Sequence, residues 1–436
     1  MHFFEQVISQ LSSLIWAVFL PVLLIVAIII AIKFFGGVKK QTTRPSKLDP
    51  RDIVGPAAIS MGAMIGTGAI IGVLGSMMSL VTNGQVYFEA IAGWSVIGAL
   101  VLIPLCYIET LVCKITNMTP KNYIAKFLNP KLGAIYAYAF ILLYVFGFGG
   151  FQVQGINSAI TIIVEGIFDI SASPLARYIV LVLPLIIIVS AIVLAKKHDV
   201  FINSMALMIG AAVIMYLVMV IIFIAKTSDY VPVYVGNILA GMKNPISAGI
   251  GLPIGFTVAV QRITQTSEPG LGALAMSSLD SDSEPTAAGL ISLIPAITTV
   301  FIAIFVTSYI TSYGVSAGIV DLQAGDSLVA LKGYFLTCFD VVGMYGLVTI
   351  TLFTVLSGIT SLLGSYYFLS VLLDFTENQN IAIYISLILI AGTLAVFGGS
   401  IIFEAVDLLM FVVTGTNLIA ILLFATKHYN QYKILD

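Results

Sequence analysis

The sequence predicts an all-helical integral membrane protein in which one extra N-terminal helix precedes two inverted sets of five membrane spans. The first observation behind this prediction is the composition, which is 59% hydrophobic and 9% charged, whereas soluble proteins contain about 25% charged residues. The second is a series of eleven apolar runs that are long enough to cross a bilayer. The third is that two of these runs, which lie five spans apart, are interrupted by glycine or by charged residues.

The predicted spans are apolar runs of about 17 residues or more, the length that crosses the hydrocarbon core of a bilayer. The first run has no basic segment before it, is too long for a signal peptide core and lacks a small-residue cleavage site, so we expect it to remain as an anchor. In chain order, the eleven spans are 12–36, 54–81, 86–113, 133–166, 174–195, 200–226, 247–276, 286–312, 340–372, 381–397 and 401–426.

The placement of Lys and Arg predicts the orientation. With the N-terminus outside, fourteen of these residues fall in inner loops and four in outer loops, and Arg262 lies within a span. This bias predicts a multi-pass protein of the cytoplasmic membrane with an outer N-terminus and a cytosolic C-terminus. The predicted organisation is an extra helix with a basic cytoplasmic linker, two five-helix repeats and a cytoplasmic tail, at residues 1–53, 54–226, 247–426 and 427–436.

Composition and residue placement exclude several function classes. A net charge of −2 leaves no basic surface for nucleic acid. The three cysteines contain no CxxC pair and the three histidines lie outside the apolar runs, so we expect neither redox chemistry nor a histidine-based metal site. No nucleophile, base and oxyanion donor can be assembled, so we expect neither an enzyme nor a cofactor.

Four glycines fall within eleven residues of the second span, at Gly62, Gly66, Gly68 and Gly72. Glycine in a helix interior costs about 1 kcal/mol relative to alanine, so this density needs a structural reason. One interpretation is close helix packing through Gly68 and Gly72. The other is a helix broken near 62–72, with unwound backbone that faces a cavity.

The seventh span is interrupted near 261–272 by polar and charged residues, a proline and two glycines. An Arg or Glu at the centre of a bilayer costs about 2.5 to 3.5 kcal/mol, so Arg262 and Glu268 must face water, a cavity or each other. An ion pair between them could act at a functional site or only lock helices together, and both roles can coexist.

The two interruptions lie at equivalent positions, because each begins a set of five spans. An odd number of spans per set inverts the second set relative to the first, and paired broken helices in inverted repeats are typical of secondary transporters with a midplane substrate site. Unwinding at the first interruption would present the backbone N–H groups of Thr67, Gly68 and Ala69 to a carboxylate.

Oxygen ligands for a cation would come from carbonyls freed by unwinding and from hydroxyls. In the ninth span, Thr360 and Ser361 are adjacent hydroxyls that could hold a small ion with the carbonyl of Ser357, although membrane hydroxyls more often bond to their own helix. In the fourth span, Gln152 and Gln154 could hydrogen-bond a substrate or equally join two helices.

These residues resemble the alanine or glycine:cation symporter family, the sodium:alanine symporter-like amino acid carriers of bacteria and archaea. The similarity extends from about 15 to 428. The resemblance implies a LeuT-type inverted-repeat fold with an extra N-terminal helix, and symport of a small amino acid with a cation. The segments that carry it are Gly66-Thr67-Gly68, Tyr107-Ile108-Glu109, Gln154 with Asn157-Ser158, Arg262 with Glu268, Gly270 and Gly272, and Asp407 with Asn417-Leu418-Ile419-Ala420.

Three departures from the family bear on the site that the resemblance implies. Ala69 and Ser267 stand where the family has asparagine, and the tryptophan expected beside Ser365 is absent. One sodium site and part of the amino acid pocket are therefore weakened, so the substrate can differ from alanine. The second sodium position of the fold is retained, and we expect one coupling ion there, bound by Gly62, Ile65, Ser357, Thr360 and Ser361.

The leading hypothesis is sodium-coupled uptake of a small neutral amino acid by alternating access, with the amino acid, the sodium ion and the lipid bilayer as partners. A proton carried by Glu268 is the alternative coupling ion, and a non-transporting membrane sensor of the same fold is the third hypothesis. The expected charge pair joins Arg262 to Glu268. The expected substrate-binding residues are Thr67, Gly68, Ala69, Gln152, Gln154, Thr264, Ser267, Glu268 and Ser365.

Overall fold

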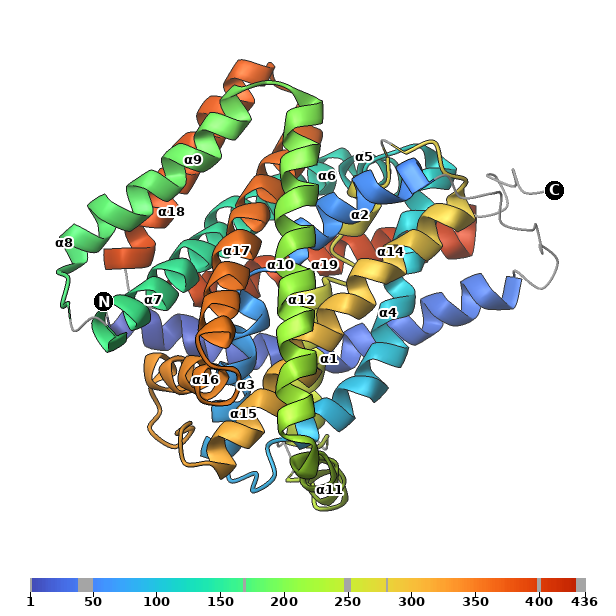
Figure 1. Cartoon of the computed structure of the whole chain (residues 1–436). Coiled ribbons are helices and arrows are strands. Elements are labelled where there is room, and N and C mark those ends of the chain that lie inside the picture. Colours follow the sequence, from blue (N-terminus) through green and yellow to red (C-terminus); the bar gives the residue numbers. More distant parts are fainter. Residues whose placement is uncertain are drawn as a thin grey trace.

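The computed structural model describes residues 2–37, 50–167, 170–246, 252–279, 281–397 and 401–428. Within these ranges the chain forms helices joined by short connections and contains no strand, which confirms the predicted all-helical class (Figure 1). The predicted basic linker with Lys39, Lys40, Arg44 and Lys47, and the tail from 429 to 436, lie outside the described residues.

Most of the predicted spans are present as helices long and apolar enough to cross a membrane. Nine helices in the described ranges meet this test, and a bent pair, Val54–Met64 with Thr67–Thr82, makes ten if it is one span. The predicted seventh span is the exception, since it consists of α12 (Ile254–Ser267) and the short α13 (Ala273–Ser277). The break between them leaves neither piece long enough to cross a bilayer alone.

The first set of spans follows the extra helix α1 (His2–Gly37). Short stretches of 3₁₀- or π-helix lie within several of its spans. In chain order its elements are α2 (Pro50–Met64), η2 (Thr67–Ala69), α3 (Ile71–Thr82), α4 (Ala90–Thr116), α6 (Pro130–Ile141), η3 (Leu142–Phe148), α7 (Gly149–Ile167), α8 (Pro174–Arg177), η4 (Tyr178–Val182), α9 (Leu183–Leu194) and α10 (His198–Lys226).

The second set begins with the broken span of α12 and α13. The predicted start of the ninth span at 340 is too early, because Gly343, with φ of +76°, ends one helix and Met344 begins the next. Its further elements are α14 (Pro285–Val300), η6 (Phe301–Val306), α15 (Thr307–Ser316), α17 (Met344–Leu372), α18 (Glu377–Phe397), α19 (Ile401–Leu423) and η7 (Phe424–His428).

Four elements outside the spans were not predicted. Their apolar runs are too short to be recognised as membrane spans. Local sequence nevertheless starts one of them clearly, since the Thr119 side chain accepts a hydrogen bond from the Asn122 N–H at the beginning of α5. These elements are α5 (Pro120–Phe127), η5 (Ser228–Tyr230), α11 (Val231–Lys243) and α16 (Ser327–Val342).

Spans at equivalent positions in the two sets pack in equivalent ways. The first and second spans of both sets form one group, in which α4 packs against α12 and α14, and α2 packs against α14. The third and fourth spans form another, in which α7 and α9 pack against α17 and α18. The fifth span of each set, α10 or α19, packs against the third span of the other set (Figure 1). This relation is the LeuT-type inverted repeat.

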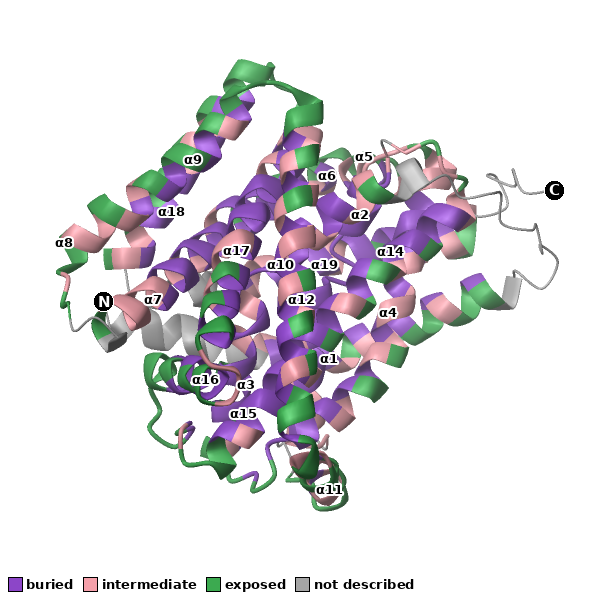
Figure 2. Cartoon of the chain, viewed as in Figure 1, coloured by how far each residue is buried: buried purple, intermediate pink, exposed green. Residues whose placement is uncertain are grey.

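The outer surface of the helix assembly is apolar, as a lipid-facing surface must be. Large side chains such as Val18, Ile187 and Leu207 are 62%, 64% and 73% exposed. The helix α17 lies at the centre and is largely buried (Figure 2). The lipid-facing surface therefore includes α1, α9 and α10, whereas the buried polar side chains of α17 face other helices.

Candidate functional site

A cavity of about 360 Å³ lies between the two broken spans. A larger hollow of about 630 Å³ lies between α4 and α14, but its walls are almost entirely apolar and suit lipid contact rather than a polar ligand. The smaller cavity has both apolar and charged walls, formed by Ala63, Met64, Gly66, Gly68, Ala69, Ile71, Gly72, Gly75, Phe148, Phe151, Gln152, Gln261, Arg262, Gln265, Thr266, Glu268, Ser327, Val406 and Asp407.

The first break lies between α2 and α3, whose axes differ by 62°. The helix ends because Gly66 is extended, with φ of −125° and ψ of −167°. A Cβ atom on Gly66 would lie 2.5 Å from the side-chain amide of Gln152, so any larger residue here would displace that amide. The Oε1 atom of Gln152 accepts hydrogen bonds from the Thr67 N–H at 2.7 Å and the Thr67 hydroxyl at 2.9 Å. The predicted break is confirmed. Gln152 satisfies the Thr67 N–H, a backbone donor that the break leaves without a helical partner.

The second break lies within the predicted range of 261–272 and begins at Glu268, since residues 261–267 are still helical. Glu268 adopts the left-handed conformation with φ of +53°, and Gly270 and Gly272 follow with φ of +82° and +95°. Thr264 remains within α12, where its hydroxyl donates to the Val260 carbonyl at 2.9 Å. The charged residue Arg262 does not break the helix, because its side chain reaches the cavity from a regular turn.

The loop of the second break is held by buried polar side chains from three other helices. Glu109 Oε2 on α4 accepts a hydrogen bond from the Gly272 N–H at 3.0 Å, and Asn417 Nδ2 on α19 donates to the Gly270 carbonyl at 2.8 Å. The Tyr136 hydroxyl on α6 donates to the Leu271 carbonyl at 2.6 Å. These bonds satisfy backbone groups that the break removes from helical pairing.

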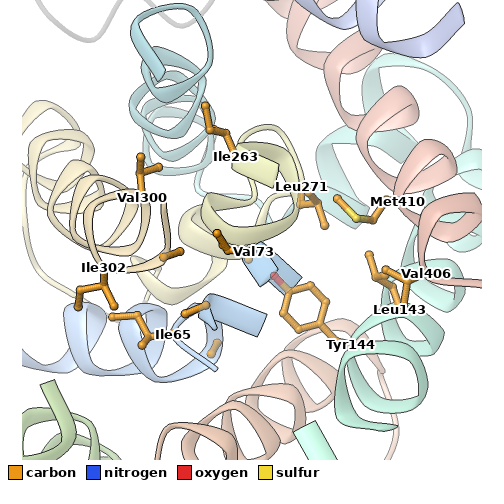
Figure 3. Close-up of a cluster of buried hydrophobic side chains, with 14 of the residues drawn as sticks. Ile65, Val73, Leu143, Tyr144, Ile263, Leu271, Val300, Ile302, Val406 and Met410 are labelled. Carbon is orange, nitrogen blue, oxygen red and sulfur yellow. The ribbon is translucent and has the colours of Figure 1, made fainter. Parts of the chain in front are cut away.

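The two breaks also share an apolar core. Ile65 and Val73 from the first broken span, and Ile263 and Leu271 from the second, belong to one buried cluster, and Tyr144 lies among them (Figure 3). The hydroxyls of Ser60 and Ser277 are 2.5 Å apart and join the two spans directly. The two broken spans are therefore in direct contact.

The charged side chains in the cavity have different hydrogen-bond partners, and Arg262 and Asp407 also attract each other electrostatically. Arg262 Nε donates to the Ser76 hydroxyl at 2.9 Å. Gln265 Nε2 donates to Asp407 Oδ1 at 2.8 Å, and the Tyr144 hydroxyl donates to the carboxyl group of Glu268. Between the described side chains of Arg262 and Glu268 there is no ion pair, because each contacts a different helix.

The structure brings some of the predicted substrate-binding residues together and places others elsewhere. Gly68, Ala69, Gln152 and Glu268 line the cavity. The other five lie outside its walls. Thr67 is bonded to Gln152, and the Ser267 hydroxyl donates to the Ala296 carbonyl at 3.0 Å. The hydroxyls of Ser365 and Thr264 bond to carbonyls of their own helices, that of Ser365 to Leu362 at 2.7 Å, and Gln154 lies on α7 with its Oε1 buried.

All five predicted cation-binding residues lie together where α2 meets α17. The Ser361 hydroxyl donates to the carbonyl oxygens of Gly62 and Ile65 at 3.0 and 3.5 Å. The Thr360 hydroxyl donates to the Ser357 carbonyl at 2.9 Å, and Gly62 is so close to Thr360 that an added Cβ would lie 3.2 Å from the threonine Cβ. Hard cations are bound by oxygen atoms of these kinds.

Two residues at or beside the cavity were not among the predicted site residues. Asp407 entered only as a match to the last helix of the family, although a carboxylate within an apolar run is itself a functional signal. Glu109 was quoted in the same way and is fully buried, with its Oε1 atom without a hydrogen-bond partner. The described residues contain no cluster of three His, Cys, Asp or Glu side chains that could hold a metal ion.

Comparisons with known proteins bear on the family and on the fold. The model of the sodium:alanine symporter family matches residues 1–434. Two solved structures of a manganese transporter from Eremococcus coleocola are similar in fold. The complex with an aromatic bis-isothiourea substituted compound is 12% identical, with a TM-score of 0.50 over 87% of this chain and 80% of that one. A point mutant of the same transporter is 13% identical, with a TM-score of 0.48 over 88% of this chain and 80% of that one. No curated protein matches the sequence significantly.

Proposed function

Because the chain belongs to the sodium:alanine symporter family, we propose that it carries a small neutral amino acid across the membrane together with sodium. The observation that supports this most strongly is the polar cavity of about 360 Å³ walled by both broken spans. Broken spans of inverted repeats form the midplane substrate site in secondary transporters. Transport of this kind needs no covalent chemistry and no cofactor beyond the coupling ion.

The charges in the cavity suit a zwitterion. Arg262 provides a guanidinium for the substrate carboxylate, and the amino end of α3, which forms part of the wall, favours the same negative group. Glu268 and Asp407 provide carboxylates for the substrate ammonium. Ala69 stands where the family has asparagine, so the pocket is wider there.

Sodium binds, in this proposal, to the oxygen atoms of Gly62, Ile65, Ser357, Thr360 and Ser361. The carbonyl of Ile65 belongs to the ion site, and the next residue, Gly66, lines the substrate cavity. Ion binding between α2 and α17 therefore acts on the break that forms the cavity wall, which gives a physical route for coupling.

The cavity includes Ser327 at the start of α16. Between the cavity and the opposite face, the loop 268–272 is held by Glu109 and Asn417. With an outer N-terminus and a cytosolic C-terminus, as the Lys and Arg placement predicts, the α16 side is extracellular. The structure then corresponds to an outward-facing arrangement, and alternating access requires the loop at the second break to open.

Removal of hydroxyls from the ion site is expected to weaken sodium binding. Ser361→Ala should raise the sodium concentration for half-maximal uptake by about tenfold, and Thr360→Ala should raise it less, because the Thr360 hydroxyl also bonds to its own helix. The measurement is initial uptake in proteoliposomes at varied sodium concentration. Thr351→Ala is the matched control, since the Thr351 hydroxyl bonds only to the Leu347 carbonyl on the same helix. Uptake that does not depend on sodium would refute the coupling.

A proton is a second candidate for the coupling ion, because Glu268 is 2% exposed, lines the cavity and accepts a hydrogen bond from Tyr144. If a proton on Glu268 drives transport, Glu268→Gln should abolish accumulation driven by a pH gradient but allow exchange of substrate across the membrane. Accumulation by the Glu268→Gln variant as high as in the unmodified protein would eliminate this version.

A further inference from the structure

A second polar cavity, of about 370 Å³, lies at the turn between α9 and α10. It is closed on the other side by the end of α17 and the start of α18. The side chain of Lys196 in the turn donates a hydrogen bond to the Asn378 side chain at the start of α18, which fixes the two sides of the cavity to each other. None of its residues lines the substrate cavity.

One end of this cavity attracts a negative group. Lys196, Lys197 and His198 follow one another in its wall. They stand at the amino end of α10, a helix of 29 residues whose first turn has no side-chain cap; Asp199 is in the same turn but does not line the cavity. Unpaired N–H groups of a first helical turn and adjacent basic side chains together bind phosphate.

The wall formed by α18 attracts a hydrogen-bond donor with positive charge. Glu377 and Asn380, in the first turn of α18, are in the same wall. Asn380 is only 4% exposed, yet its side-chain oxygen has no hydrogen-bond partner. Among the described residues, neither Lys197 nor His198 forms an ion pair with Glu377, so the opposite charges of the cavity do not neutralise each other directly.

The cavity also lies where a lipid headgroup would be. The candidate membrane span that contains α9 ends at Leu194, and α10 begins at His198. Ile192, Phe201 and Phe375 add apolar walls. A ligand with a polar head in the cavity would therefore have its apolar part beside lipid-exposed helices.

We propose that this cavity binds the headgroup of a phospholipid that carries a primary amine. The phosphate lies at the Lys196–His198 turn, and the ammonium donates hydrogen bonds to Glu377 and Asn380. The lipid then joins α10 of the first repeat to α17 and α18 of the second, and it stabilises their packing at this face of the membrane.

The test is binding of three lipids with identical acyl chains to the delipidated full-length protein, measured by native mass spectrometry. Phosphatidylethanolamine is expected to bind about tenfold more tightly than phosphatidylcholine, whose methylated amine has no N–H donor, and than phosphatidylglycerol, which has no amine. Equal binding of the three lipids would overturn the proposal.

Two substitutions test which side chains bind the phosphate and which bind the ammonium of the headgroup. Glu377→Gln should lower the affinity for phosphatidylethanolamine about tenfold and leave that for phosphatidylglycerol unchanged, whereas Lys197→Gln should lower both. Both side chains are exposed, so the variants should keep the unmodified melting temperature. Glu284→Gln and Lys243→Gln, at exposed positions outside the cavity, are the matched controls.

Two other results would contradict the assignment. Stronger binding of phosphatidylglycerol, unaffected by Glu377→Gln, would show an anionic-lipid site instead. Competition by soluble glycerophosphoethanolamine at the same concentration as the lipid would show that the ligand is a small phosphorylated amine and not a membrane component. The proposal predicts that this soluble headgroup competes only at much higher concentration.

Discussion

Gly72→Ala is expected to lower uptake about hundredfold, because displacement of a positioning group by about 1 Å has effects of this size. A Cβ atom on Gly72 would lie 2.2 Å from Nη1 and 3.2 Å from Cζ of Arg262. The guanidinium is the flexible end of a side chain, so it would move out of the cavity wall while the helices stay in place. The measurement is the initial rate of uptake in proteoliposomes, together with substrate affinity.

Gly75→Ala is the matched control for this prediction. Gly75 lies one turn further along α3 and also lines the cavity, but an added Cβ would meet no atom within 4 Å. Alanine favours a helix over glycine by about 1 kcal/mol at both positions, so loss of helix stability cannot explain a difference between them. Equal rates for the two variants would mean that Arg262 does not act on the substrate.

Glu109→Leu is expected to lower the thermal stability of the protein strongly. The substitution leaves the buried N–H of Gly272 without its acceptor, and Asn417 Nδ2 loses its contact with Glu109 Oε2 at 3.4 Å. Asn417 keeps its bond to the Gly270 carbonyl, whereas an unsatisfied buried group such as the Gly272 N–H costs about 1 to 3 kcal/mol, so we expect a loss of stability of that size. Glu109→Gln keeps a hydrogen-bond acceptor in a side chain of the same shape, so this variant should lose much less stability.

The measurement for Glu109 is the melting temperature of the purified protein in one detergent. Glu165→Leu is the control, because Glu165 is exposed and its substitution removes the same charge. If Glu109→Leu melts at the same temperature as Glu165→Leu, the loop 268–272 is not held by Glu109, and the closed inner side of the cavity needs another explanation.

The fold could be predicted from the sequence because its main determinants are local. Long apolar runs define the spans, and the glycines of the first break identify the place where the chain unwinds. The short elements α5, α11 and α16 were missed, since a helix of this length leaves no hydropathy signal of a span. The second break falls within the predicted range of 261–272, but only its later part is non-helical, because charge does not end a helix, whereas the left-handed residue Glu268 does.

The site was less predictable, because it depends on contacts between distant parts of the chain. Thr264 and Ser365 were named as candidates for substrate binding, but their hydroxyls bond to carbonyls of their own helices. This is the common behaviour of hydroxyls in membrane helices. The contact between Glu109 and Asn417 joins residues 308 positions apart and left no local signal.

Sodium-driven accumulation of an amino acid by proteoliposomes tests the proposed function most directly. With sodium only outside, the protein should concentrate at least one small neutral amino acid above its external concentration, and a sodium ionophore should release it. For each amino acid, uptake with a sodium gradient is compared with uptake at equal sodium concentration on both sides of the membrane. Absence of accumulation for every amino acid, or the same uptake without a sodium gradient, would contradict the proposal.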